Sequence, residues 1–366
     1  MSADFECDLL IQHASVIDGS GQPAYQADVA VFGDKIIAIA PQLTLTSKVH
    51  IDGSGLVLAP GFIDVHTHDD TNVIRTPDML CKISQGVTTV IVGNCGISAS
   101  PVTLKGAPPD PMNLLGQQAD FNYPTFAAYA NAVTHASPRV NVAALVGHTA
   151  LRNNHMADLF NAATDGQIQQ MCLQLRQAME EGALGLSSGL AYASAKQAPM
   201  SEVKALVAEL AAYNGIYTTH MRTEFDDIMT AMTEAFETAQ HGKVPLIISH
   251  LKCAGAANWG RTTQTLAYLD RQAQQQKVAC DYYPYSASSS TLDLTQVTDD
   301  FDIFITWSEG APEQGGKLLA DIANAWQLSL YDAAIRLQPA GAVYHGLHPD
   351  DVKRVLPYPR TMVGSD

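Results

Sequence analysis

From Leu58 onward, the chain alternates short apolar segments with stretches that have the periodicity of amphipathic helices. Apolar runs separated by helices are typical of a parallel β-sheet that is covered on both faces. Eight runs are each expected to form a strand: Leu58 to His68, Gly86 to Cys95, Asn141 to His148, Leu184 to Leu190, Ile216 to Met221, Pro245 to His250, Lys277 to Tyr285 and Thr361 to Asp366. This pattern predicts a (β/α)8 barrel of the TIM type. A doubly wound open sheet is the competing fold, but no Gly-x-Gly-x-x-Gly motif follows a strand to support it.

Three of the connecting helices can be located from their ends. Thr164 and Gln167 form a capping box ahead of apolar residues at helical spacing, and Gly182 ends that helix. Two further helices are expected within residues 199–215 and 229–242, each with a stripe of apolar side chains and a terminal glycine. We interpret these stripes as packing positions that face the sheet.

The N-terminal part of the chain has a different character. Residues 1–57 form short strand-like segments separated by turns, which are too small to close a core by themselves. We therefore expect a small β domain over residues 1–57 and the barrel over residues 58–366. Two connections in the barrel, at 96–124 and about 286–360, exceed the usual handful of residues, and the second is predicted to be a lid-like insertion.

Composition limits the partners and the compartment. The formal net charge of -16, from 37 acidic and 21 basic residues, argues against nucleic acid or an anionic membrane as a partner, and a small molecule is the expected ligand. The N-terminus lacks the basic and apolar regions of a signal peptide, and no stretch is apolar over the length of a membrane span. The six cysteines form no Cys-x-x-Cys motif, so a cytoplasmic location is the simplest expectation. The oligomeric state stays open.

Metal-binding side chains gather at the ends of the predicted strands. His66 and His68 end the first strand, where strand alternation would point both imidazoles the same way. In a (β/α)8 barrel, the carboxyl ends of all the strands meet at one rim, so residues from other strands join this pair. These are Cys95, His148, His220, His250, Asp281, Tyr283 and Asp366. Imidazole, thiolate and carboxylate groups are the ligands that zinc prefers, and the sequence therefore predicts a zinc site.

Two of these residues have plausible structural interpretations. Cys95 could be a small buried apolar residue, which is the common fate of a free cysteine, although its place opposite the histidines favours a thiolate ligand. His148 could simply form a hydrogen bond with a loop. The other five cysteines lack a comparable position and are interpreted as structural.

Several motifs resemble a known family. Residues 59–68, with the sequence Ala-Pro-Gly-Phe-Ile-Asp-Val-His-Thr-His, resemble the amidohydrolase superfamily. Gly93 to Gly96, Ser249 to Lys252, Asp281 to Tyr285 and Gly364 to Asp366 narrow the resemblance to the N-acyl-D-amino acid deacylases, also called D-aminoacylases. The similarity extends over the whole chain.

The resemblance implies a particular arrangement of metal. Zinc would be bound tightly by Cys95, His220 and His250. His66 and His68 would lie beside it with Asp366, at a second position that members of the family occupy weakly or not at all. Many amidohydrolases bridge two metals with a carboxylated lysine at the end of strand four. The strand-four segment Leu184 to Leu190 has no lysine here, so the cysteine of strand two is interpreted as its substitute.

The resemblance also implies how the reaction would proceed. A metal-activated water would attack the amide carbonyl, with Asp366 acting first as general base and then as general acid. Lys252, Tyr283 and Ser289 would hold the substrate α-carboxylate, Tyr192 would contact it, and Tyr283 or His148 would help to stabilise the oxyanion. Lys252 could instead be a solvated loop lysine, and Ser289 lies in a serine-rich loop with several equivalent hydroxyls.

The expected function is zinc-dependent hydrolysis of N-acyl-D-amino acids to a carboxylate and a free D-amino acid. Cyclic amide hydrolysis, as in dihydroorotases and hydantoinases, is an alternative that the missing strand-four lysine disfavours. A third alternative is an inactive zinc-binding fragment, because members of the family continue beyond the position of Asp366 with an arginine that grips the substrate carboxylate. A truncated copy of a genuine deacylase, rather than an evolved short form, is the expectation. The preference for neutral or acidic D-amino acids and the number of bound metals stay open.

Overall fold

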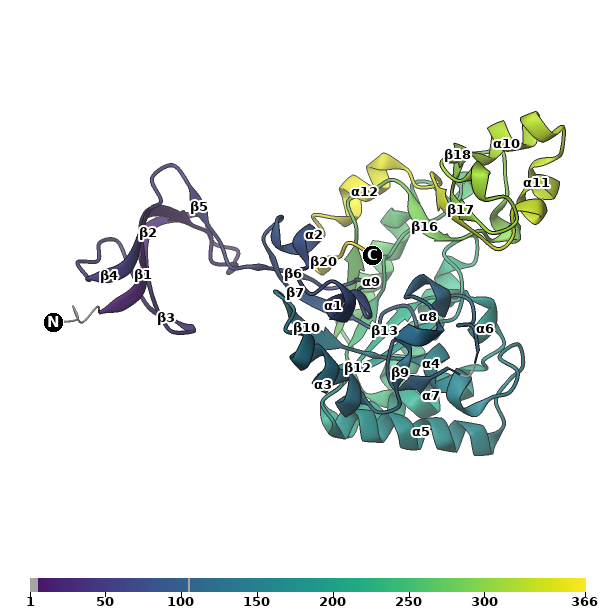
Figure 1. Ribbon diagram of the computed structural model, residues 1–366, viewed down its shortest axis with the longest axis horizontal. Helices are drawn as coiled ribbons and strands as arrows, with labels where there is room; N and C mark the ends of the chain where they lie inside the picture. The colour runs from purple at the N-terminus through teal and green to yellow at the C-terminus, as the bar shows by residue number, and fades with distance from the viewer. Residues whose placement is uncertain (1–5, 105) are drawn as a thin grey trace. The chain divides into compact units, whose positions relative to one another are not determined.

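A computed structural model describes residues 6–104 and 106–366 of the protein (Figure 1). The chain divides after Phe62 into two compact units, which are described separately. In the described residues, no helix combines the length and the apolar composition that crossing a bilayer requires.

The first unit is a five-stranded sheet. Its strands are β1 (Cys7–Val16), β2 (Tyr25–Phe32), β3 (Lys35–Ala40), β4 (Ser47–Asp52) and β5 (Val57–Leu58). They lie in the order β3-β2-β1-β4, and β5 pairs with β1. Its described residues bury two small apolar clusters, as expected for a sheet of this size.

The second unit is built on a ring of eight strands. They are β6 (Phe62–Asp64), β7 (Val87–Val92), β10 with β11 (Asn141–Ala144 and Val146–Gly147), β12 (Gly185–Gly189), β13 (Ile216–His220), β14 (Leu246–Ile248), β15 (Val278–Tyr282) and β20 (Thr361–Val363). Neighbouring strands are parallel: β7 pairs with β10, β11 with β12, β12 with β13, β13 with β14, β14 with β15, and β15 with β20. The ring closes where the Val65 N–H donates to the Val363 carbonyl at 3.3 Å. The predicted (β/α)8 barrel is confirmed.

The first barrel strand is shorter than predicted. We expected one strand from Leu58 to His68, but β5 ends at Leu58 and pairs with β1, whereas β6 covers only Phe62–Asp64. Pro60 lies in the gap, where it provides no N–H group for a sheet ladder. His66 and His68 therefore lie beyond the strand, and strand alternation does not explain why their side chains are close together.

The helices agree more closely with the prediction. Helix α5 (Asp165–Glu180) begins at the capping box of Thr164 and Gln167, with both reciprocal hydrogen bonds present. The two other predicted helices correspond to α7 (Met200–Ala208), continued by the 3-10 turn η3 (Glu209–Tyr213), and to α8 (Ile228–Gly242). Their apolar stripes are buried in the main core cluster, as predicted.

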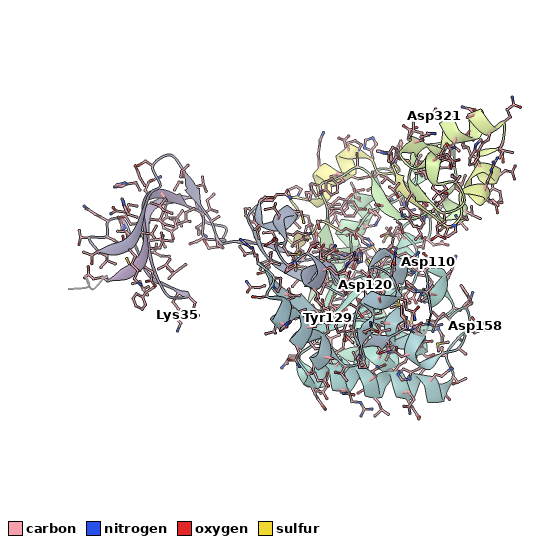
Figure 2. The ribbon with its side chains drawn as sticks, in the orientation of Figure 1. Lys35, Asp110, Asp120, Tyr129, Asp158 and Asp321 are labelled. Atoms are coloured by element: carbon pink, nitrogen blue, oxygen red, sulfur yellow. The ribbon has the colours of Figure 1, made fainter. Side chains whose placement is uncertain are left out.

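Further helices complete the second unit. They are α1 (Asn72–Arg75), α2 (Leu80–Ile83), α3 (Phe126–Ala136), α4 (His148–His155), α6 (Ala193–Lys196), α9 (Thr262–Gln272) and α12 (Pro349–Val355). Tyr129 of α3 illustrates how a helix is tied to the barrel rim, since its hydroxyl donates to the carbonyl of Asp70 at 2.7 Å (Figure 2).

Both long connections contain folded structure of their own. The first contains the strand pair β8 (Val102–Thr103) and β9 (Asn122–Tyr123) over a small apolar cluster. The second contains a four-stranded sheet in the order β16-β19-β17-β18. Strands β17 and β18 and two helices are drawn in yellow-green at the upper right of Figure 1. The elements of this second connection are β16 (Ser288–Thr291), β17 (Ile303–Ser308), β18 (Lys317–Leu318), α10 (Leu319–Trp326), α11 (Leu330–Leu337) and β19 (Ala340–Tyr344), and they enclose a separate apolar core.

Candidate metal centre

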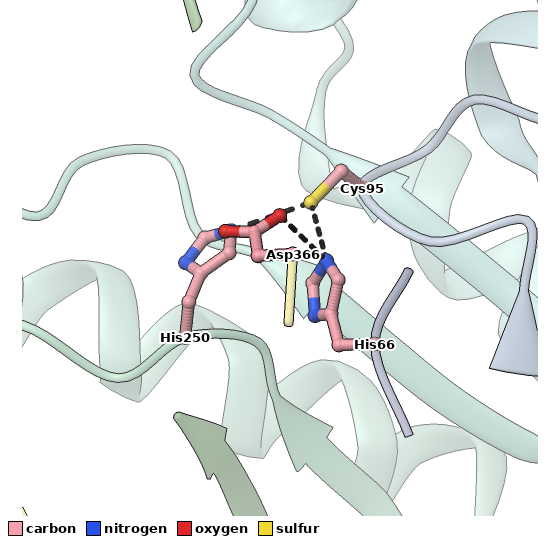
Figure 3. Close-up of side chains that lie close together, drawn as sticks. All are labelled: His66, Cys95, His250 and Asp366. Atoms are coloured by element: carbon pink, nitrogen blue, oxygen red, sulfur yellow. Dashed lines mark hydrogen bonds and ion pairs between the residues drawn. The ribbon is translucent and has the colours of Figure 1, made fainter. Parts of the chain in front are cut away.

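Four side chains converge at the carboxyl ends of the barrel strands. His66, Cys95, His250 and Asp366 each offer one ligand atom, and these atoms all lie within 4.8 Å of one another (Figure 3). The Cys95 Sγ lies 3.2 Å from His66 Nε2 and 3.3 Å from His250 Nε2. The Asp366 Oδ1 lies 3.3 Å from His66 Nε2. His66, Cys95 and His250 are buried, Asp366 is exposed, and a set of nitrogen, sulfur and oxygen donors such as this is the chemistry of a zinc site.

His68 and His220 complete the cluster. His68 Nε2 lies 3.3 Å from the same Asp366 oxygen. The ring of His220, the last residue of β13, lies 4.5 Å from the ring of His250 between centroids. The Nδ1 atoms of His68 and His220 are buried without a hydrogen-bond partner in the described part of the chain, although buried polar atoms are normally paired. All the predicted ligands are thus brought together, and the residues fit a metal.

Glycines place the Cys95 thiol. Gly93 and Gly96 have φ angles of +80° and +76°, and Cys95 between them also has a positive φ of +53°. A Cβ at Gly93 would collide with the carbonyl oxygen of Leu145, and one at Gly96 with the backbone nitrogen of Gly189. Only glycine fits both positions, so the chain turns sharply after β7 and directs Cys95 towards the histidines.

Asp281, a residue of β15, contacts two of the candidate metal ligands, His66 and His250. Its Oδ1 lies 2.9 Å from His66 Nδ1 and accepts the backbone N–H of His250 at 2.7 Å. A carboxylate on the outer nitrogen of a histidine fixes the ring orientation and directs the other nitrogen to the metal. The sequence placed Asp281 at the rim, and the structure shows its contacts.

Glu224 was missed by the sequence analysis. It is buried, and its Oε1 lies 2.7 Å from His250 Nδ1 and 2.8 Å from Lys252 Nζ. Nothing in the strand pattern indicates it, because it lies in the loop after β13. The available signal was Lys252 itself, since a lysine beside a buried ligand requires a counter-ion.

The electrostatics favour anionic sulfur and oxygen donors. Burial raises the pKa of the Cys95 thiol, but the neighbouring His66 and His250 outweigh burial and hold that pKa well below its ordinary value. Burial likewise opposes ionisation of Asp366, and the same two histidines keep its pKa well below the ordinary range. The surroundings therefore favour the anionic forms of both donors, a thiolate and a carboxylate.

The residues predicted to hold the substrate line one cavity of about 1640 Å³. Lys252, Tyr283, Ser289 and Tyr192 all contribute to its wall, together with His68, His220, His250 and Asp366. The Tyr192 ring lies 4.8 Å from the His220 ring between centroids. The Tyr283 hydroxyl is buried and has no hydrogen-bond partner in the described residues, so it is available to a ligand.

Lys252 is not the solvated loop lysine of the alternative interpretation. Its side chain is buried, and its Nζ lies 2.8 Å from both Glu224 Oε1 and His250 Nδ1. The same Nζ lies 5.6 Å from the centre of the Tyr283 ring. Lys252 thus belongs to the wall of the site, with its charge already paired.

His148 lies apart from the other predicted residues. It begins α4, it is fully buried, and its Nε2 lies 2.8 Å from Glu202 Oε1 of α7. Arg152 Nη1 donates to the same oxygen at 2.5 Å. The predicted contact of His148 with substrate is therefore corrected: the side chain is engaged in a buried ionic cluster, in keeping with its structural interpretation.

Comparison with known proteins identifies close relatives. A model of the Amidohydrolase family matches residues 49–304. The D-aminoacylase of Alcaligenes xylosoxydans xylosoxydans is 42% identical over 359 residues, which cover 98% of this chain and 74% of that protein. The N-acyl-D-aspartate and N-acyl-D-glutamate deacylases of the same organism are 41% and 40% identical, over 100% and 98% of this chain and 73% of each relative.

Solved structures agree with these relatives. A crystal structure of D-aminoacylase has a TM-score of 0.95 and 40% identity, over 99% of this chain and 76% of that one. The N-acyl-D-glutamate deacylase of Bordetella bronchiseptica, complexed with zinc and a phosphonate mimic of the tetrahedral intermediate, has a TM-score of 0.93 and 40% identity, over 98% of this chain and 76% of that one. An L-hydantoinase from Arthrobacter aurescens, with a TM-score of 0.51 and 15% identity over 77% of this chain and 59% of its own, shares the fold alone.

Proposed function

This chain belongs to the amidohydrolase family, and from that premise we propose that it is a zinc-dependent hydrolase that cleaves the amide bond of N-acyl-D-amino acids. The products are a carboxylate and a free D-amino acid. The observation that carries the proposal is the convergence of Cys95, four histidines and Asp366 beside a cavity large enough for such a substrate, with His68, His220, His250 and Asp366 in the cavity wall.

Within this proposal, Cys95, His220 and His250 bind zinc tightly. His66 and His68, with Asp366, form a second and weaker position. The place of His220 in the first set is supported by its buried Nδ1, which has no hydrogen-bond partner in the described residues. The Cys95 sulfur lies 3.3 Å from His250 Nε2 and 3.2 Å from His66 Nε2, so it is within reach of both positions. Zinc bound there supplies Lewis-acid chemistry, which activates water and polarises the amide carbonyl.

Asp366 transfers the protons. Hydrolysis forms a bond between the water oxygen and the carbonyl carbon and breaks the carbon–nitrogen bond. Asp366 first takes a proton from the attacking water, which its low pKa allows because the side chain is ionised at neutral pH. It then donates that proton to the departing nitrogen. His66 and His68, both 3.3 Å from its Oδ1, hold the carboxylate in place.

The α-carboxylate of the substrate binds to Lys252, Tyr283 and Ser289, with Tyr192 beside it. The free Tyr283 hydroxyl is a ready donor in the buried wall, and Ser289 is exposed in the same cavity. The Lys252 ammonium is also paired with the Glu224 carboxylate, so it binds the substrate carboxylate while it keeps that ion pair.

One activity panel tests the function. The purified protein is assayed with N-acetyl-D-amino acids of neutral and acidic side chains, with their L-enantiomers and with hydantoins, and zinc is quantified in the same sample. Hydrolysis of D-substrates in proportion to zinc is expected. Turnover of hydantoins alone would replace the proposal by cyclic amide hydrolysis, and zinc binding without turnover would support an inactive fragment. The proposed cytoplasmic location is tested by cell fractionation.

A further inference from the structure

Glu224 lies between the proposed metal-binding residue His250 and Lys252. The single oxygen Oε1 lies 2.7 Å from His250 Nδ1 and 2.8 Å from Lys252 Nζ. Lys252 Nζ is also 2.8 Å from His250 Nδ1. All three side chains are buried, so His250 Nδ1, the Lys252 ammonium and the Glu224 carboxylate form a closed triangle.

The triangle creates a competition at His250 Nδ1. His250 directs its Nε2 towards Cys95, and a neutral imidazole binds metal through Nε2 only when Nδ1 carries the proton. A protonated Nδ1 needs an acceptor, and an ammonium group has none. If Lys252 donated to Nδ1 instead, the ring proton would move to Nε2 and block that nitrogen. Among the described residues, the acceptor within reach of Nδ1 is Glu224, whose Oε1 is 2.7 Å away.

We propose that Glu224 is a positioning residue that selects the metal-binding tautomer of His250 by engaging both Nδ1 and the ammonium of Lys252. The carboxylate accepts from both donors and keeps Lys252 from donating to the ring. Glu224 contacts the Nδ1 of His250 as Asp281 contacts the Nδ1 of His66. The inference rests on the proposed function, because it gives Glu224 a task at the metal centre of that hydrolase.

The backbone around Glu224 is built to hold it. The Glu224 carbonyl accepts the N–H of Ala254 at 2.8 Å, which ties the loop after β13 to the loop after β14. A second hydrogen bond connects the same two loops, since Asn258 Nδ2 donates to Asp226 Oδ1 at 2.9 Å. The loop that carries Glu224 is therefore fixed to the segment that carries His250 and Lys252.

The test measures zinc affinity, which needs no turnover. The dissociation constant for zinc is determined by chelator competition for the wild type, Glu224→Gln, Lys252→Met and the double variant Glu224→Gln/Lys252→Met, with circular dichroism to verify folding. Glu209→Gln is the matched control, since Glu209 forms an ion pair with Arg176 at 2.9 Å. Loss of a carboxylate behind a ligating histidine typically weakens metal binding by about 10- to 100-fold, and this is expected for Glu224→Gln.

The remaining variants separate tautomer selection from general support. Lys252→Met keeps the carboxylate and should bind zinc as the wild type does. The double variant removes the competing donor, so it should recover part of the affinity lost in Glu224→Gln. It also avoids an unpaired buried lysine, so it remains informative if the single variant does not fold.

Three results would overturn the proposal. The first is wild-type zinc affinity in a folded Glu224→Gln protein, and the second is a double variant that binds zinc no better than Glu224→Gln. The third, which applies when only the double variant folds, is a double variant that binds zinc as tightly as the wild type. A wild-type protein that binds zinc but cleaves no N-acyl-D-amino acid would contradict the proposed function and leave these comparisons of zinc affinity intact.

Discussion

At the scale of single residues, the centre depends on side chains whose charge is set by their neighbours. Asp366 is ionised because His66 and His250 outweigh the effect of burial on its pKa. Replacing Asp366 by Asn should lower kcat by about 10²- to 10⁴-fold, because the amide can neither take nor return the proton. Zinc content should persist, since Cys95, His220 and His250 remain.

Asp321→Asn is the control for that variant, because Asp321 is exposed on α10 (Figure 2). Wild-type kcat in a zinc-loaded Asp366→Asn protein would contradict the proposed proton transfer by Asp366.

Cys95→Ala should instead reduce the zinc content itself, and unchanged stoichiometry by metal analysis would refute the assignment of Cys95 as a ligand.

A second residue prediction concerns stability and pH. Burial raises the pKa of Glu202, but hydrogen bonds and charge from His148 and Arg152 outweigh it and lower the pKa from 4.5 to about 2. The stabilisation is therefore complete above pH 4.5 and is lost as the pH falls towards 2. Glu202→Gln, which leaves Arg152 unpaired, should lower the free energy of unfolding at pH 7 by about 3 kcal/mol.

Denaturant unfolding at pH 7, 5, 4 and 3 checks this, and the difference between wild type and Glu202→Gln should shrink only below pH 4.5. A difference that is constant over the whole range would show that the Glu202 charge does not contribute.

At the scale of elements, the sequence predicts the strands and helices that follow a regular pattern, and it misplaces the strand ends where the backbone departs from that pattern. The capping box of Thr164 and Gln167 located the start of α5, because it is a local signal. The ends of β7 and β14 were misplaced, because Cys95 and His250 have positive φ angles that no apolar pattern indicates. Glu224 lies in the loop after β13 and acquires its role only through contacts with His250 and Lys252, which follow another strand, so its type and spacing do not reveal it. Asp281 of β15 was placed at the rim by the strand pattern, but its contacts with His66 and His250 were not predicted.

Closure of the barrel is the element-scale feature with the clearest test. Lys82 Nζ of α2 lies 2.7 Å from Asp64 Oδ2 in β6 and 2.7 Å from Ser365 Oγ after β20. The other Asp64 oxygen accepts the Ser365 N–H at 2.9 Å. Lys82→Met should lower the free energy of unfolding by about 3 kcal/mol, as for other broken buried pairs, and should lower kcat because Ser365 precedes Asp366.

The control for this variant is Lys204→Met, whose partner Glu237 is 3.6 Å away and half exposed. A change of less than about 1 kcal/mol is expected there. Equal effects of the two substitutions, measured by denaturant unfolding, would contradict a special role for Lys82 in closing the ring.

At the scale of the whole molecule, the metal centre joins segments from across the barrel. His66, Cys95, His220, His250 and Asp366 follow or end five different strands, so their side chains come together only when the ring is closed. A ligand that binds only the folded state stabilises it by RT ln(1 + [L]/Kd), about 2.7 kcal/mol at a hundredfold excess over Kd. Removing zinc with a chelator should therefore lower the unfolding midpoint of the barrel, and adding zinc back should restore it. In Cys95→Ala, the chelator should have little effect, because tight binding is already lost. Differential scanning calorimetry of both proteins, with and without chelator, measures these midpoints. A wild-type unfolding midpoint that does not respond to zinc would mean that the centre does not couple metal binding to closure of the barrel.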